Sequence, residues 1–565
     1  MLNAPPGASK HRSERTIFSA LKKRNWKAKR IMNASEYLNT EMSRRALIKG
    51  ATAAGLALAA GMPNASAAPA KSSVIQRENA KPGTKDWMLT NVWIDPDTWW
   101  RSPRIEGYCS ETSVSGGDTL KIMVSTNPVA AFDLEIFRTG YYGGTGGRSM
   151  KKFTSIQGKT QSDPPVGENR LRECAWEPSV EFQIPDDWVS GVYLGKLTTK
   201  RVEGVYQSRL TAKEGLQSYV IFVVRDDRPC DLLFQVSDMA WACYNSWPDD
   251  QWSLYHGDEF VLQGSGRKKW STNANETGWV SFDRPYANFC QSHLVDRPSS
   301  VGSGEFLLWE FPLSYWMEQQ GYDVSYISNL DTHNDAPGLQ RAKGFISVGH
   351  DEYWTREMYA NVMAARDAGV NLAFLSGNSV WGVVPLLPSS AGQPQRVMRR
   401  EGLFVGEEAY YKEFQNSRGT KYPPGPDGAL LMGGRMGADS ILPPGGPWVC
   451  TKPDHWLYEG TGMKEGDRIE GLIGWEWHGH PAKDLPGHEI VASAHPINPW
   501  SGKKKAIHTG TMYDGPKGNV VFGAGTIWWA QGLSSPPGHV LPGKTQGPDE
   551  RVQRMMTNVF DRFIQ

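Results

Sequence analysis

The fold of this chain is decided by the stretch Gly344-Phe-Ile-Ser-Val-Gly-His-Asp-Glu-Tyr-Trp-Thr-Arg-Glu-Met-Tyr-Ala-Asn-Val-Met-Ala-Ala-Arg-Asp-Ala-Gly369. Its first five residues are apolar or prone to β-structure and predict a buried strand. From Thr355 the pattern is that of a helix, with Thr355 as its N-cap and Gly369 as its stop. The six residues between them, Gly349–Trp354, are predicted to form a strand-to-helix loop. This loop carries an imidazole, two carboxylates and a phenol, so we expect chemistry there.

The segments on both sides of this stretch alternate between strand and helix patterns. An amphipathic helix that ends at Gly321 is predicted over residues 305–321, and a last helix from about residue 549. Such alternation predicts a parallel sheet with helices on its faces, doubly wound rather than closed into a barrel. We therefore predict an α/β doubly wound domain over residues 230–565. Its strands are predicted at residues 231–237, 323–328, 345–348, 371–376 and 520–523.

Polar and aromatic side chains follow these strands, where the chain leaves the sheet. The group His350–Tyr353 and Asn378 each come directly after a predicted strand. Because the carboxyl ends of parallel strands meet at one edge of a sheet, we expect these side chains to lie close together. Trp241, Tyr244 and Asn245 follow the first strand. They either line a substrate pocket or pack the loop, and the pattern leaves both alternatives open.

Residues 74–228 have a different organisation. Short strand patterns are separated by Gly, Pro and Asp, and no helical period of useful length is present. This predicts an all-β sandwich of immunoglobulin-like type. The glycine-rich segment 141–147 lacks the Lys-Ser/Thr of a phosphate-binding loop, so a hairpin turn is the better interpretation. The clearest strands are predicted at residues 119–125, 132–138, 192–198 and 218–224.

Residues 1–67 are predicted to be an export leader. The basic pair in Ser43-Arg44-Arg45-Ala46-Leu47-Ile48-Lys49 precedes a short apolar run, Gly50–Gly61, and the small-residue site Ala65-Ser66-Ala67. This order is typical of a twin-arginine signal. Twelve apolar residues are too few to span a bilayer, so no stable membrane anchor is expected. The protein is therefore predicted to be periplasmic or secreted.

The charges exclude one class of partner. The chain has a formal net charge of +1, and residues 1–67 hold 12 Lys and Arg against 3 Asp and Glu, a net of +9. The remaining residues therefore carry a net of −8. A mildly acidic mature protein is not expected to have the basic surface that binds nucleic acid.

Two residue types leave alternatives open. The six cysteines have no C-x-x-C spacing, so neither a zinc site nor a redox pair is predicted, and disulfides and free buried thiols both stay open. The 23 tryptophans either fill the core and anchor loops or form a stacking surface for sugars or other flat ligands.

Several motifs in order resemble those of one known family. Together they resemble the C-terminal domain of the N,N-dimethylformamidase large (β) subunit, over about residues 230–565. Each motif is weak alone, but their order along one domain is specific. The motifs are Trp241–Trp247, Ser253–Tyr255, Gly321–Tyr326, Asp331–His333, Gly349–Trp354, Gly377–Asn378 and Gly471–Glu476.

This resemblance implies a fold, a cofactor and an activity. The family domain is similar to the class I glutamine amidotransferase fold. Its named enzyme hydrolyses a small tertiary amide with a mononuclear iron (Fe³⁺) held by two tyrosines and a glutamate. By resemblance, Tyr353 of the H-x-E-Y-W signature and Glu476 are the candidate metal ligands. The second tyrosine is sought in the helix around Phe311–Tyr315.

The residue types fit such chemistry. Phenolate and carboxylate are hard oxygen ligands suited to a ferric ion. His350 or Glu352 is the candidate general base, and Asn378 is a candidate donor to a developing oxyanion. Asp351 is expected to be a charge at the start of the following helix.

We therefore expect an exported hydrolase that cleaves the C–N bond of a small amide with the help of iron. The alternative is a non-catalytic envelope protein that binds polysaccharide through its Trp-rich loops and its sandwich. The expected partner is a small amide substrate; a homo-oligomer and a small partner subunit both stay open.

Overall fold

The computed structural model describes residues 73–98, 100–200, 215–249, 251–255, 259–261, 268–270, 278–287, 300–410, 423–483, 485–499, 501–539 and 547–565. Residues 71–565 form one compact unit. The predicted leader, residues 1–67, lies outside the described residues. Within the described ranges, no helix has the length and apolar character needed to cross a bilayer.

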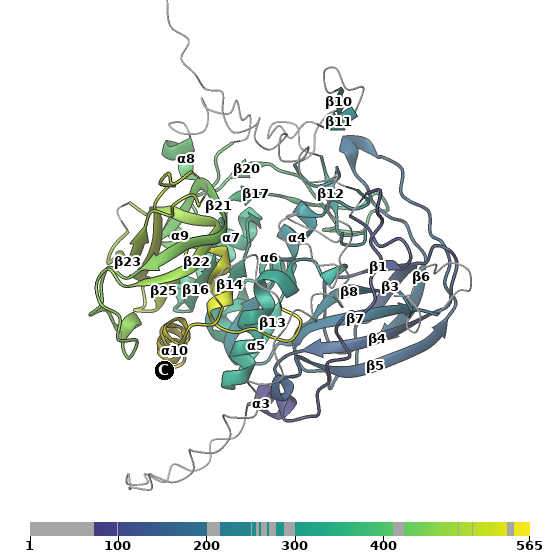
Figure 1. Ribbon diagram of the computed structural model, residues 1–565, viewed down its shortest axis with the longest axis horizontal. Coiled ribbons are helices and arrows are strands. Elements are labelled where there is room, and N and C mark those ends of the chain that lie inside the picture. The colour runs from purple at the N-terminus through teal and green to yellow at the C-terminus, as the bar shows by residue number, and fades with distance from the viewer. Residues whose placement is uncertain are drawn as a thin grey trace, which may run out of the picture. The chain divides into compact units, whose positions relative to one another are not determined.

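A seven-stranded sheet forms the centre of the second half of the chain (Figure 1), in the order β13-β9-β14-β16-β25-β24-β23. The first five strands run parallel, and β24 and β23 extend them in antiparallel pairing. The carboxyl ends of β9, β13, β14 and β16 therefore share one edge, as expected. The relation to glutamine amidotransferases stays a prediction. The strands are β9 (Cys230–Gln235), β13 (Val324–Ile327), β14 (Ala342–Gly349), β16 (Asn371–Ser376), β23 (Glu489–Ala494), β24 (His508–Asp514) and β25 (Val520–Gly523).

The stretch that starts with β14 folds as its pattern predicts. Helix α7 begins at Arg356, and the Thr355 side chain accepts a hydrogen bond from the Met358 N–H. Gly369 ends the helix in the left-handed conformation, with φ +112°. Local signals were strong at both ends of this helix, which is why its bounds were predictable.

The strands that precede the central sheet form two further sheets, with the orders β1-β3-β6 and β2-β8-β7-β4-β5. Side chains from both sheets share one apolar core, which includes Ile122, Ile136 and Phe222. The glycine-rich segment connects β4 to β5 as an antiparallel hairpin, as predicted. The immunoglobulin-like type stays a prediction. The strands are β1 (Glu106–Cys109), β2 (Ser113–Val114), β3 (Thr119–Ser125), β4 (Phe132–Thr139), β5 (Gly147–Ile156), β6 (Pro178–Gln183), β7 (Gly191–Thr199) and β8 (Gln217–Val224).

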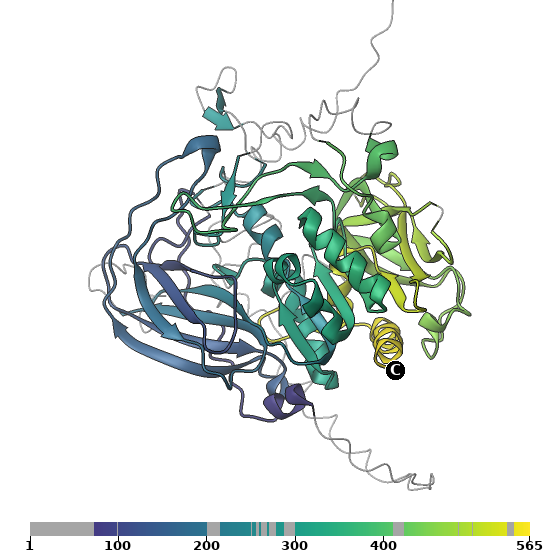
Figure 2. The ribbon, with the colours of Figure 1, turned by 180° about the vertical axis from the view of Figure 1, so that it is seen from behind.

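Helices pack against the central sheet. The C-terminal helix α10 (yellow in Figure 2) lies against β14 and β9 with an apolar face. The predicted amphipathic helix over 305–321 differs from expectation, because a π-helical turn, η5 (Phe306–Glu310), comes first and α5 is buried at every position from Phe311 to Glu318. The α-helices are α3 (Val74–Asn79), α4 (Asp238–Tyr244), α5 (Phe311–Gln320), α6 (Asn329–Asn334), α7 (Arg356–Ala368), α8 (Gly406–Ala409), α9 (Ala429–Met432) and α10 (Glu550–Ile564).

The chain between β16 and β25 contributes a long antiparallel hairpin, β21 (Gly434–Val449) and β22 (Arg468–Pro481). This hairpin packs beside β23 and β24 (Figure 1). Shorter elements complete the fold. They are β10 (Glu259–Val261), β11 (Lys268–Trp270), β12 (Val280–Ser281), β15 (Tyr353–Trp354), β17 (Gly382–Val383), β18 (Leu386–Leu387), β19 (Val397–Met398), β20 (Gly402–Leu403) and the 3₁₀ turns η1 (Tyr142–Gly144), η2 (Glu168–Arg170), η6 (Pro337–Arg341), η8 (Trp456–Tyr458) and η9 (Ile527–Gly532).

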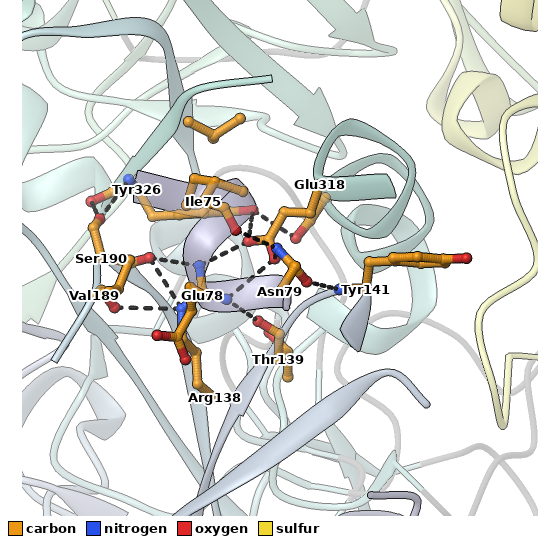
Figure 3. A network of polar contacts seen from close by, with 12 residues as sticks. Ile75, Glu78, Asn79, Arg138, Thr139, Tyr141, Val189, Ser190, Glu318 and Tyr326 are labelled. Carbon is orange, nitrogen blue, oxygen red and sulfur yellow. Dashed lines mark hydrogen bonds and ion pairs between the residues drawn. The ribbon is translucent and has the colours of Figure 1, made fainter. Parts of the chain in front are cut away.

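A buried ionic network joins the sandwich strands to the helices of the central sheet (Figure 3). The Arg138 guanidinium on β4 donates two hydrogen bonds to the Glu318 carboxylate on α5, at 2.8 and 3.1 Å, and both side chains have no exposed area. Asn79 of α3 and the Tyr326 hydroxyl also donate to Glu318, each at 2.8 Å. Arg138 donates further to the Ser190 carbonyl. Three segments far apart in the sequence thus meet on one carboxylate.

The cysteines and tryptophans settle two questions within the described residues. Cys109, Cys174, Cys230, Cys243 and Cys450 are free and buried, and Cys290 lies outside the described residues. Of the tryptophans whose side-chain exposure the structure describes, most are buried, the rest are half-buried, and none is exposed. The described tryptophans therefore fill the core and anchor loops.

Candidate functional site

The loop after β14 starts at a glycine whose position accepts no side chain. Gly349 has φ +70°, and a Cβ there would lie 2.8 Å from the Cβ of Trp309. Trp309 belongs to η5, so the loop backbone packs directly against the π-helical turn. The chain then passes through His350, Asp351 and Glu352 into β15, which pairs in parallel with β17.

Asp351 anchors the loop through hydrogen bonds to the residues of neighbouring elements. Its carboxylate accepts hydrogen bonds from Gln235 at 2.6 Å, Ser347 at 2.9 Å and Asn329 at 3.1 Å. Burial raises the pKa of Asp351 to about 6, although these hydrogen bonds oppose the rise. The expectation of a charge at the helix start is wrong, because α7 begins only at Arg356 and Asp351 is fully buried.

His350 lies between two carboxylates. Its Nε2 is 3.1 Å from Oε2 of Glu476 and 3.4 Å from Oε2 of Glu352. The Asn378 amide donates to the same Glu476 oxygen at 3.0 Å. Burial alone would lower the pKa of His350, but the hydrogen bond to Glu476 and the charges of Glu352, Glu476 and Glu305 raise it above the ordinary value of 6.5. The geometry thus holds the His350 imidazole beside the Glu476 carboxylate.

Three tyrosines meet on the other side of Glu352. The Tyr244 hydroxyl, at the end of α4, donates to the Glu352 carboxylate, and the Tyr255 hydroxyl lies 3.2 Å from Oε1 of the same group. The hydroxyls of Tyr244 and Tyr255 are 2.8 Å apart. The Tyr353 hydroxyl donates to that of Tyr255 at 2.6 Å. Three phenol oxygens and one carboxylate therefore form a continuous cluster.

A guanidinium closes the cluster. Nη2 of Arg400 donates to the Tyr353 hydroxyl at 2.7 Å, and its Cζ lies 4.7 Å from the centroid of the Tyr255 ring. Burial and the charge of Glu352 raise the pKa of Tyr255 above its ordinary value of 10, and Arg400 opposes the rise. Burial raises the pKa of Tyr353 as well, again opposed by Arg400. These phenols therefore keep their protons unless positive charge is added beside them.

Glu352 and Glu476 differ in their surroundings. The Glu352 side chain is 2% exposed, and burial raises its pKa although His350 and Arg400 oppose the rise. The Glu476 side chain on β22 is 20% exposed. Glu476 is therefore the carboxylate of this pair that reaches solvent.

The other residues singled out in the sequence lie at the border of this cluster. The Trp241 indole N–H donates to Glu310 at 2.7 Å. Asn245 donates to the Pro285 carbonyl at 2.9 Å and accepts from the N–H groups of Trp247 and Ala287. Within the described residues, both side chains make their hydrogen bonds in loop and helix packing, whereas Tyr244 belongs to the cluster.

Sequence reasoning missed two members of the cluster. Tyr255 belongs to the family-like motif Ser253–Tyr255, but the sequence assigned it no function. Nothing in the sequence pointed to Arg400. The second tyrosine was sought near Phe311–Tyr315, but Tyr315 lies against Tyr141, with ring centroids 5.2 Å apart. The partner of Tyr353 is Tyr255 instead.

The oxygen donors of the cluster are arranged as ligands of one small cation would be. Two oxygen ligands at right angles on a cation with bonds of about 2.0 Å are about 2.8 Å apart, and Tyr244 and Tyr255 have this separation. Both also contact Glu352. In the part of the chain that the structure describes, no three His, Cys, Asp or Glu side chains form a metal site. The fitting donor set is therefore two phenols and one carboxylate.

Comparison with known proteins gives one informative match. Residues 133–544 match the family model described as N,N-dimethylformamidase beta subunit-like, C-terminal. The match begins in β4, so it includes most of the sandwich strands. No curated protein matches the chain. A family 123 glycoside hydrolase from Clostridium perfringens is similar over 49% of this chain and 74% of its own, at 9% identity and a TM-score of 0.11, which is too low to carry an argument.

Proposed function

The chain belongs to the N,N-dimethylformamidase beta subunit-like C-terminal family, and from this membership and the site geometry we propose that it hydrolyses the C–N bond of a small amide. The observation that carries the proposal is the convergence of Tyr244 and Tyr255 on Glu352, next to the pair His350 and Glu476. Export by the twin-arginine route, to the periplasm or outside the cell, is part of the same proposal.

We infer that Tyr244, Tyr255 and Glu352 would hold the ferric ion that the family implies. When bound, such an ion acts as a Lewis acid on the amide carbonyl or on water. Tyr353 is a poorer candidate than the sequence suggested, because its hydroxyl already bonds to the cationic Arg400. In this proposal Tyr353 orients Tyr255 by hydrogen bonding, and Arg400 holds Tyr353.

The proposal also exchanges the roles that the sequence suggested for two glutamates. Glu352 has the two phenol neighbours that a ligand set requires. Glu476 is partly exposed, and its Oε2 is held by His350 and Asn378. Its Oε1 therefore remains to take a proton from the attacking water. His350 orients the Glu476 carboxylate and stabilises its charge, and Asn378 supports it from the other side.

The first test uses tyrosine variants and needs no substrate. The wild type is expected to contain near-stoichiometric iron and to show a phenolate-to-iron charge-transfer band in the visible spectrum. Tyr244→Phe and Tyr255→Phe are each expected to lose or strongly weaken this band, because each removes a ligand oxygen. Tyr353→Phe is expected to keep the band with a shifted maximum, because it removes only a hydrogen bond to Tyr255.

Tyr315→Phe serves as the matched control, since Tyr315 packs against Tyr141 away from the cluster. The wild type is also assayed on a panel of small N-substituted amides. Folded protein without metal and without amide hydrolysis would overturn the proposed function. Loss of the band in Tyr353→Phe alone would return the ligand role to Tyr353.

The alternative function has lost its main support in the described residues. Polysaccharide binding by Trp-rich loops requires exposed indole rings on which sugars can stack. None of the tryptophans whose side-chain exposure is described is exposed. We therefore do not propose that function.

A further inference from the structure

One buried carboxyl beside the cluster has no task in the proposed function. Glu305 stands directly before η5 and is 1% exposed. Neither of its carboxyl oxygens has a hydrogen-bond partner among the described residues. A buried carboxylate without partners is very costly, so such a group is held in its neutral, protonated form.

The packing places Glu305 at the catalytic loop. A Cβ on the preceding residue, Gly304, would lie 2.6 Å from the Trp241 ring, three residues before Tyr244. On the other side, Trp309 packs against Gly349, the residue before His350. Glu305 is thus held between the helix that carries Tyr244 and the loop that carries His350.

The charged groups that act on Glu305 are members of the site. The pKa of Glu305 is raised to about 8, mainly by burial; the charge of His350 opposes the rise, and the charges of Glu352 and Glu476 contribute to it.

We propose that Glu305 is the general acid that protonates the leaving nitrogen of the amide. This inference rests on the proposed function. An amine is a poor leaving group without a proton, so C–N cleavage needs a donor as well as a base. Glu305 is buried, and its carboxyl oxygens have no hydrogen-bond partner among the described residues, so a protonated Glu305 would be able to donate to a substrate nitrogen.

The hydrolysis conserves the number of bonds and protons. The water oxygen bonds to the carbonyl carbon, and the water proton goes to Glu476. The C–N bond breaks, its electron pair stays on nitrogen, and nitrogen takes the proton of Glu305. Glu476 then holds one proton more and Glu305 one fewer. Transfer of that proton through His350 or solvent restores both groups.

Glu310, the last residue of η5 and five residues after Glu305, provides the matched comparison. It is also fully buried, but its Oε1 accepts hydrogen bonds from Ser237 and from Trp241. Its task is therefore to hold α4 against η5. Glu310→Gln keeps an acceptor oxygen for both donors, so it probes the structural role of a buried carboxyl in this segment.

The experiment compares amides that differ in the basicity of the leaving amine. Glu305→Gln is expected to lower kcat by about 10²–10⁴-fold on an amide of an alkylamine. On an anilide with an electron-withdrawing ring, whose amine leaves without prior protonation, the loss is expected to be less than about tenfold. Glu310→Gln is expected to affect both substrates equally. An equal loss on both substrates in Glu305→Gln would overturn the assignment.

A second measurement reports on Glu305 without turnover. The infrared difference spectrum between wild type and Glu305→Gln at pH 7 is expected to contain the C=O band of a protonated carboxyl. Absence of this band in an active enzyme overturns the proton donor and leaves the proposed function standing. Presence of the band in a protein that hydrolyses no amide overturns both. Glu305→Asp, which keeps the acid but withdraws it by one methylene, is expected to keep the band and lose rate.

Discussion

Replacing Glu476 by glutamine is expected to lower kcat on any amide substrate by about 10²–10⁴-fold. Glutamine has the same shape and still accepts from Asn378, which donates to Oε2 of Glu476 at 3.0 Å. It cannot take a proton from water, however, so the variant removes the proposed base and keeps the hydrogen bond. Steady-state kinetics on the best substrate of the amide panel measures the effect.

The same variant also decides between the two roles of Glu476. If Glu476 is the base, Glu476→Gln keeps the charge-transfer band of the iron, whereas Glu352→Gln loses it. If Glu476 is a ligand, the band disappears in Glu476→Gln. Glu470→Gln is the matched control, since Glu470 is exposed on the same strand and pairs with Arg468; its kcat should equal that of the wild type.

Truncating Glu318 to alanine is expected to lower the free energy of unfolding by about 3–5 kcal/mol. The variant leaves the fully buried Arg138 guanidinium without its carboxylate. The Asn79 amide and the Tyr326 hydroxyl also lose the acceptor of their hydrogen bonds. The cost comes mainly from the uncompensated charge rather than from the lost attraction. Urea-induced unfolding followed by tryptophan fluorescence measures it.

Two further variants separate this explanation from a simple packing defect. The double variant Arg138→Met with Glu318→Leu removes both charges and is expected to recover most of the lost stability. Glu135→Ala breaks a solvent-facing pair with Lys152 and should cost no more than about 1 kcal/mol. A double variant as unstable as Glu318→Ala would show that the ionic explanation is wrong.

The sequence predicted elements well where the signals are local. The strand before Gly349, the Thr355 cap and the Gly369 stop all depend on neighbours within four residues, and the structure confirms each of them. The same reasoning predicted an amphipathic helix over 305–321. It missed that α5 is buried all round, because the neighbours that bury it come from distant parts of the chain.

The site was predictable only in part for the same reason. His350 and Glu352 lie in one short motif, and their proximity follows from the loop itself. Tyr255 and Arg400 meet at Tyr353 from positions about 100 residues before and about 50 residues after it. No sequence spacing predicts these contacts, because they form only through tertiary packing. Asp351 was misjudged because an exposed helix-end charge and a buried loop anchor have the same local pattern.

The position of α3 limits how far the N-terminus can be trimmed. If the leader is removed after Ala67, six residues remain before Val74. A protease that cut only a dozen residues further on would remove Asn79, which donates to Glu318 at 2.8 Å and accepts from the N–H groups of Tyr141 and Tyr142. A chain shortened past α3 would therefore lose the Asn79 hydrogen bonds that connect Glu318 to the segment after β4.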